Sequence, residues 1–122
     1  MWLDLTFKYT AIFTAIILHE IAHGYAALLM GDDTAKKEGR LSLNPLKHAD
    51  LFGWAKPVPI DFRKLKYHRK GIILVSAAGI IMNIWVAVIS ALFILLIQFI
   101  PHPYTQMILH MFFLNMAAFN II

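Results

Sequence analysis

Three long apolar stretches constrain the fold of this chain more than any other feature of its sequence. They cover about residues 9–30, 71–100 and 104–122. A helix needs about 20 mainly apolar residues to cross the hydrocarbon core of a bilayer, so each stretch is long enough to span a membrane. The middle stretch exceeds that length, and a helix there should tilt or protrude. The sequence therefore predicts about three transmembrane helices.

The composition also indicates contact with lipid. Hydrophobic residues make up 60% of the 122 residues and charged residues only 15%, whereas soluble domains are about 45–50% apolar. The chain contains no cysteine, which excludes disulfides and thiolate metal sites. The length suits a single domain. We expect an all-α polytopic membrane protein in which the lipid bilayer surrounds the helices.

A polar connection, residues 31–70, separates the first two apolar stretches. It contains ten of the eleven Lys and Arg residues of the chain. By the positive-inside rule, this excess predicts that the connection faces the cytoplasm in a multi-pass protein of the cell membrane. The basic residues are not interleaved with aromatic ones, so they do not indicate a nucleic-acid partner.

Local patterns within the connection predict a small strand-containing element. Gly31 followed by two Asp residues is typical of a helix stop and a turn. Residues 39–45 alternate briefly and end at a proline, as a short strand does. The Pro57-Val58-Pro59 run also favours an extended backbone.

The first apolar stretch contains a polar cluster, His19-Glu20-Ile21-Ala22-His23. Side chains four residues apart on a helix project from one face, so His19 and His23 can bind one metal ion. Glu20 points in a neighbouring direction, where it can act as general base for a water molecule that Zn²⁺ activates. Ionisable side chains are costly inside a membrane helix, and three at this spacing favour a metal site over a hydrogen-bonded packing cluster.

With these residues in view, the sequence resembles the site-2 proteases, a family of intramembrane zinc metalloproteases. The matching segments are His19–Gly24, the run Gly39-Arg40-Leu41-Ser42-Leu43-Asn44-Pro45 followed by His48 and Asp50, residues 52–59, Ser76-Ala77-Ala78-Gly79 with Asn83, and Phe119-Asn120.

The resemblance implies an enzyme that hydrolyses peptide bonds in transmembrane substrate helices, in regulated intramembrane proteolysis. It implies that His19 and His23 bind Zn²⁺, that Glu20 is the general base and that Asn120 helps to stabilise the oxyanion. The family's third zinc ligand, an Asp, would follow beyond Ile122. Residues 1–122 are therefore expected to form a single membrane-embedded metalloprotease core, truncated at its C-terminal end, which binds zinc weakly and cleaves poorly.

Two departures from the family pattern affect the region around the site. Ile80 stands where the family usually has Pro. Gly53 runs directly into Trp54, where family members usually have a further apolar segment. The entrance to the site and the loop topology can therefore differ from the family's.

Two other function classes remain open, and some polar residues have simpler interpretations. The chain could be a non-catalytic membrane protein that keeps the helix motif and binds membrane partners, or a metal transporter. Transporters usually show paired repeats with broken helices, and the sequence shows none. We expect surface hydrogen bonds for His48 and Asp50, and helix packing for His110. No motif specifies the substrate or the oligomeric state.

Overall fold

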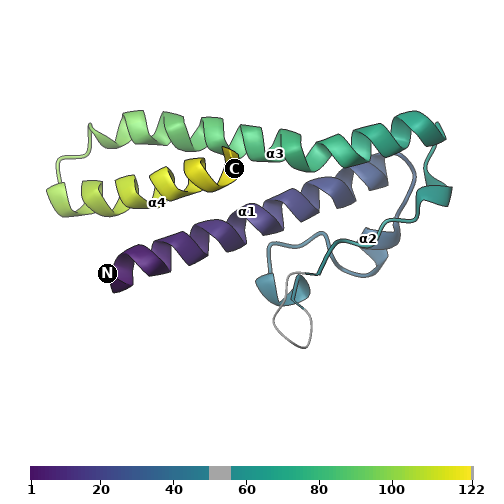
Figure 1. The fold of residues 1–122 in the computed structure, drawn as a ribbon, viewed down its shortest axis with the longest axis horizontal. Coiled ribbons are helices and arrows are strands. Elements are labelled where there is room, and N and C mark those ends of the chain that lie inside the picture. The colour runs from purple at the N-terminus through teal and green to yellow at the C-terminus, as the bar shows by residue number, and fades with distance from the viewer. Residues whose placement is uncertain (50–55, 122) are drawn as a thin grey trace. The chain divides into compact units, whose positions relative to one another are not determined.

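The computed structural model describes residues 1–49 and 56–121. Its elements, in chain order, are α1 (Trp2–Leu29), α2 (Thr34–Lys37), η1 (Pro45–Lys47), η2 (Phe62–Lys64), α3 (His68–Ile97) and α4 (Pro103–Ile121) (Figure 1). The prediction of an all-α fold with three main helices is confirmed. The predictions for Asp50, for the Phe52-Gly53-Trp54 run and for Ile122 lie outside the described residues.

The first helix begins earlier than its apolar stretch. We expected it from about residue 9, and α1 starts at Trp2. Asp4 lies in the first turn, and its carboxylate is 2.7 Å from the ammonium of Lys8 one turn later. Such a pair supports a helix without adding apolar surface. The apolar pattern therefore marked the part of the helix suited to lipid and missed the polar first turns.

Gly31 ends α1, as its sequence context predicts. It has a φ of 104°, a conformation that glycine adopts without the steric cost of a Cβ atom. The N–H of Asp32 donates to the carbonyl of Ala27 at 2.9 Å, and the N–H of Gly31 donates to that of Leu28 at 3.1 Å. This pair of bonds is the Schellman motif, which satisfies the last carbonyls of a helix.

The chain divides into two compact units. The first unit comprises Met1–Ala15 and Asn83–Ile122. Within it, α4 folds back beside the second half of α3 (Figure 1). The rings of Phe93 and Phe113 stack with their centroids 4.8 Å apart, and Phe112 meets Phe7 edge-on at 6.3 Å.

The second unit, Ile16–Met82, contains the polar connection and the parts of α1 and α3 next to it. Its small core is formed by the buried side chains of Ala27, Leu65 and Val75. Asp32 is fully buried, and its carboxylate accepts hydrogen bonds from the backbone N–H groups of Thr34 at 3.0 Å and Asp61 at 2.7 Å. The bond to Asp61 holds the start of the connection, at Asp32, next to the segment that precedes η2.

The predicted strand-containing element is not formed in the described part of the connection. Gly39 has a φ of 66° and ends α2, and the N–H of Arg40 donates to Ala35 at 2.9 Å. The Ser42 hydroxyl then accepts from the N–H of Asn44, and the Asn44 side chain caps η1. The strand prediction was wrong because these short polar side chains bond to the nearby backbone and give it an alternative to a strand ladder.

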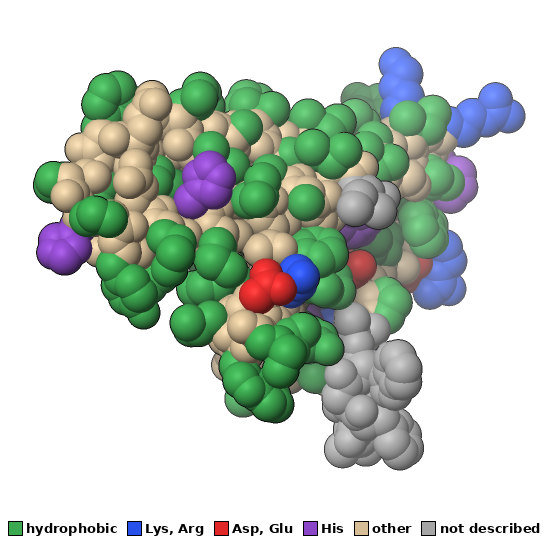
Figure 2. All heavy atoms as spheres, turned by 60° about the vertical axis from the view of Figure 1, so that its left-hand side comes forward, with side chains coloured by type: hydrophobic (Ala, Val, Ile, Leu, Met, Phe, Trp, Pro, Cys, Tyr) green, Lys and Arg blue, Asp and Glu red, His purple; other side chains and the backbone are tan. Residues whose placement is uncertain are grey.

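Two of the three long helices qualify as candidate membrane spans. Among the described residues, Trp2–Leu29 and His68–Ile97 are long and apolar enough to cross a membrane. Their most apolar parts are only 28% and 17% buried, whereas the core helix of a soluble protein is mostly buried. Hydrophobic side chains cover much of the face seen in Figure 2. The third predicted helix is formed as α4, but it is not among the candidate spans.

Candidate metal centre

His19 and His23 point their ring nitrogens at one another from one face of α1. Their Nε2 atoms are 3.0 Å apart, and the two rings meet edge to face with centroids 4.6 Å apart. Two nitrogens bound to one zinc ion at ~2.0–2.1 Å in tetrahedral geometry lie roughly 3.3–3.4 Å apart. The observed spacing therefore fits two ligands of one ion after a small opening of the rings.

The backbone of α3 determines which nitrogen of His23 can bind a metal. The Nδ1 atom of His23 lies 2.6 Å from the carbonyl oxygen of Val75. Because a carbonyl only accepts, Nδ1 must be the protonated nitrogen and donate this bond. The Nε2 atom of the neutral ring then keeps its lone pair, which is the state that a metal ligand needs.

Gly79 leaves the space in which the two imidazoles meet. A Cβ atom added at this position would collide with Nε2 of both His19 and His23. The absence of a side chain at Gly79 thus allows α3 to approach the two histidines closely. Ile80, which stands in place of the family's proline, is exposed, and α3 continues through it.

Glu20 is held by the backbone of the polar connection. Its Oε2 atom accepts a hydrogen bond from the N–H of Val58 at 2.8 Å. Pro57 and Pro59 have no N–H, so Val58 provides the only backbone donor in this three-residue run. Sequence reasoning missed this contact because the donor is a backbone group 38 positions away.

A comparison with curated proteins gives this geometry a family context. The chain is 44% identical over 91 residues to the protein described as "Putative zinc metalloprotease YwhC" from Bacillus subtilis (strain 168), and the match covers 66% of this chain. The resemblance to the site-2 protease family is confirmed. The matched region spans 42% of that relative's length. No family model matches the chain, and no solved structure matches it.

Asn120, the further catalytic residue that the site-2 protease resemblance implies, lies in the first unit. Its side chain is buried, and Nδ2 donates to the carbonyl of Met116 at 2.7 Å within α4. Its Oδ1 atom is buried without a hydrogen-bond partner among the described residues. The catalytic role of Asn120 stays a prediction.

His48 differs from its sequence prediction. We expected surface hydrogen bonds, but the side chain is only 4% exposed. Its Nε2 atom lies 2.7 Å from the carbonyl oxygen of Ser42 and donates to it. His48 therefore stabilises the fold of the connection around η1.

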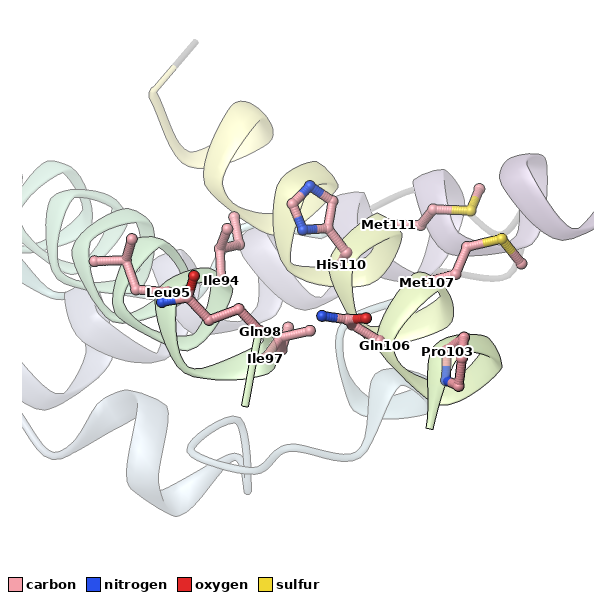
Figure 3. Close-up of a pocket in the computed structure, with 9 residues that line it drawn as sticks. All are labelled: Ile94, Leu95, Ile97, Gln98, Pro103, Gln106, Met107, His110 and Met111. Atoms are coloured by element: carbon pink, nitrogen blue, oxygen red, sulfur yellow. The ribbon is translucent and has the colours of Figure 1, made fainter. Parts of the chain in front are cut away.

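His110 belongs to the first unit and is not part of a metal-binding group among the described residues. It is exposed on α4 and lines a pocket of about 540 Å³ between the end of α3 and the start of α4 (Figure 3). The other polar side chains of this pocket are Gln98 and Gln106. No group of three or more His, Cys, Asp or Glu residues that could hold a metal occurs in the described ranges. His19 and His23 are therefore the two candidate ligands that the described residues bring together.

Three charged side chains of the polar connection, Asp33, Asp61 and Arg63, have shifted pKa values. The hydrogen bond from Lys37 lowers the pKa of the Asp33 carboxyl. The hydrogen bond from Arg63 lowers the pKa of Asp61, and the same contact raises the pKa of Arg63. Both carboxyl groups lie within or beside the short elements of the connection, and the Asp61 side chain also caps η2.

Proposed function

We propose that this chain forms the catalytic core of an intramembrane zinc metalloendopeptidase that cleaves transmembrane helices of other proteins. The observation that carries this proposal is the convergence of the His19 and His23 Nε2 atoms, with the tautomer of His23 set by Val75. The relative described as a zinc metalloprotease supports the same chemistry.

Zinc would be held by His19 and His23, and when bound it supplies a Lewis acid that polarises a scissile carbonyl and increases the acidity of water. Glu20 serves as the general base. The Val58 N–H engages Oε2, and a carboxylate has further lone pairs with which to take a proton from the attacking water. The half-buried position of Glu20 limits, but does not close, its access to water.

The site would work within a bilayer. The two candidate spans, α1 and α3, leave most of their apolar surface exposed to their surroundings, as lipid-facing helices do. The basic connection would lie on the cytoplasmic side of the cell membrane. Because the backbone groups of a substrate helix are paired within the helix, the substrate must unwind locally before Glu20 and water can reach its peptide bond.

Proteolysis of a membrane-embedded reporter tests this function. The full-length protein is reconstituted in liposomes with reporters that each contain one transmembrane helix, and cleavage products are identified by mass spectrometry. We expect cleavage inside the helix that stops on zinc chelation and resumes when zinc is returned.

The matched variant is Glu20→Gln, which keeps the shape of the side chain but cannot take a proton from water. Cleavage should fall about 10²–10⁴-fold, the range lost with a general base, while zinc content stays unchanged. Cleavage at the unmodified rate in Glu20→Gln would remove Glu20 from the base role. Absence of cleavage in every reporter, with zinc bound, would favour a non-catalytic, partner-binding protein.

A further inference from the structure

Arg40 is a buried cation that has no carboxylate partner among the described residues. Arg40 is only 6% exposed. No ion pair in the described part of the chain includes it. Its Nε atom is buried and has no hydrogen-bond partner among the described residues. A guanidinium keeps its positive charge in proteins. Burying it costs free energy, and the contacts that it makes have to offset this cost.

Those contacts lead directly to the residue that holds Glu20. The Nη2 atom of Arg40 donates to the carbonyl of Lys56 at 2.6 Å and, more weakly, to that of Pro57 at 3.4 Å. The Pro57 carbonyl and the Val58 N–H belong to one peptide unit, and this peptide is trans. In a trans peptide the C=O and N–H groups point in opposite directions, so one rigid plane has Arg40 at its carbonyl side and Glu20 at its N–H side.

The sequence around Val58 leaves this peptide plane few alternatives. The prolines on either side restrict the backbone and offer no other donor to Glu20. Gly24, one helical turn after Glu20, lets the connection approach α1: a Cβ atom added there would lie 3.1 Å from Cγ1 of Val58 and closer still to the side chain of Leu41. The close packing at Gly24 therefore brings the Val58 N–H within reach of the carboxylate.

We propose that Arg40 is a positioning residue for Glu20, acting through the carbonyls of Lys56 and Pro57 and the N–H of Val58. Its charge fixes the peptide whose N–H holds Oε2, and so sets the direction of the remaining carboxylate oxygen. Small misplacements of reacting groups can cost about 10²-fold in rate. The catalytic consequence rests on the proposed function, whereas the contact between Arg40, Val58 and Glu20 does not.

The first test reads the Val58 amide directly. The metal-free full-length protein is labelled with ¹⁵N-valine in nanodiscs, and the Val58 signal is assigned by its loss in Val58→Ile. A hydrogen bond to a carboxylate should move the Val58 amide proton downfield and slow its exchange with solvent. Glu20→Ala should abolish both effects, and Arg40→Met should abolish most of them.

The control is Arg63→Met, which removes an arginine of the same connection whose side chain is 90% exposed. It should leave the Val58 signal unchanged. Arg40→Lys serves if Arg40→Met fails to fold, because a lysine keeps the charge but loses the planar fork; it should give an intermediate shift. The proposal would be overturned if the Val58 signal of Arg40→Met matched that of the unmodified protein. If only Arg40→Lys folds, the same comparison is made with that variant.

The second test separates positioning from a general structural role. In the reconstituted protein, Arg40→Met should lower kcat about 10–100-fold, while KM and zinc content change less than about threefold. Loss of zinc together with kcat would mean that Arg40 only maintains the fold, and would also overturn the proposal. If the unmodified protein cleaves no reporter, the proposed function fails, but the Val58 signal still decides whether Arg40 positions Glu20.

Discussion

The Nδ1–H of His23 donates to a carbonyl 52 positions further along the chain, and Glu20 accepts from an N–H 38 positions away. Both partners are backbone groups, so the residues that provide them, Val75 and Val58, have no side-chain chemistry that a sequence motif could reveal. The sequence therefore predicted His19, Glu20 and His23 as candidate site residues, but the groups that orient their side chains required the fold.

Gly79 offers the sharpest residue-scale test, because its missing Cβ leaves room for both imidazoles. We expect Gly79→Ala to weaken zinc binding roughly 10–100-fold, the range found when the support of a metal ligand is lost. The helix itself should persist, because Ala favours a helix over Gly by about 1 kcal/mol. Zinc competition titration and circular dichroism measure the two effects.

The neighbouring Ile80→Ala is the matched control. Ile80 is exposed on the same helix, so shortening its side chain should leave the zinc affinity unchanged. Equal zinc affinity in Gly79→Ala and the unmodified protein would show that the imidazoles do not need this space.

At the scale of the elements, glycines follow the ends of two helices, α1 and α2. Gly31 was recognised from its context as a helix stop, and it closes α1 with a Schellman motif. The pattern around Gly39 was misread as the start of a strand, because alternation over a few residues does not distinguish a strand from a helix end followed by capped turns. Strands also need a partner, and the described part of the connection bonds its polar side chains locally instead.

Replacing Gly31 tests this element-scale interpretation. With a φ of 104°, Gly31→Ala should destabilise the protein by about 1–2 kcal/mol, since a Cβ atom is strained in left-handed conformations. Glu38→Ala is the control, because Glu38 has a φ of −81° that alanine adopts readily. Thermal unfolding in detergent should show a lower midpoint for Gly31→Ala alone, and equal midpoints for the two variants would contradict the role of Gly31.

At the scale of the whole molecule, long apolar helices and one basic connection suggest a defined orientation in a membrane. The presence of two long helices, α1 and α3, was predictable because a run of about 20 mainly apolar residues is typical of a membrane-spanning helix. Whether α4 qualifies as a membrane span was not predictable from its length, because a helix of this length can form without being apolar enough to be a candidate span.

The orientation can be measured with single cysteines, since the chain has none of its own. We expect a membrane-impermeant maleimide to label Lys37→Cys in inverted vesicles but not in intact cells, because the Lys and Arg excess predicts a cytoplasmic connection. His102→Cys, in the turn before α4, should show the opposite pattern. Labelling of Lys37→Cys in intact cells would show that the orientation is the reverse of the predicted one.

The coordination of zinc in the full-length protein tests the central claim most directly. Zinc K-edge X-ray absorption should show two imidazole nitrogens at ~2.0–2.1 Å, and His19→Ala and His23→Ala should each lose this signal together with bound zinc. His102→Ala, which removes an exposed histidine, should change nothing. A zinc spectrum that stays the same in both His19→Ala and His23→Ala would contradict the assignment of this pair as the metal centre.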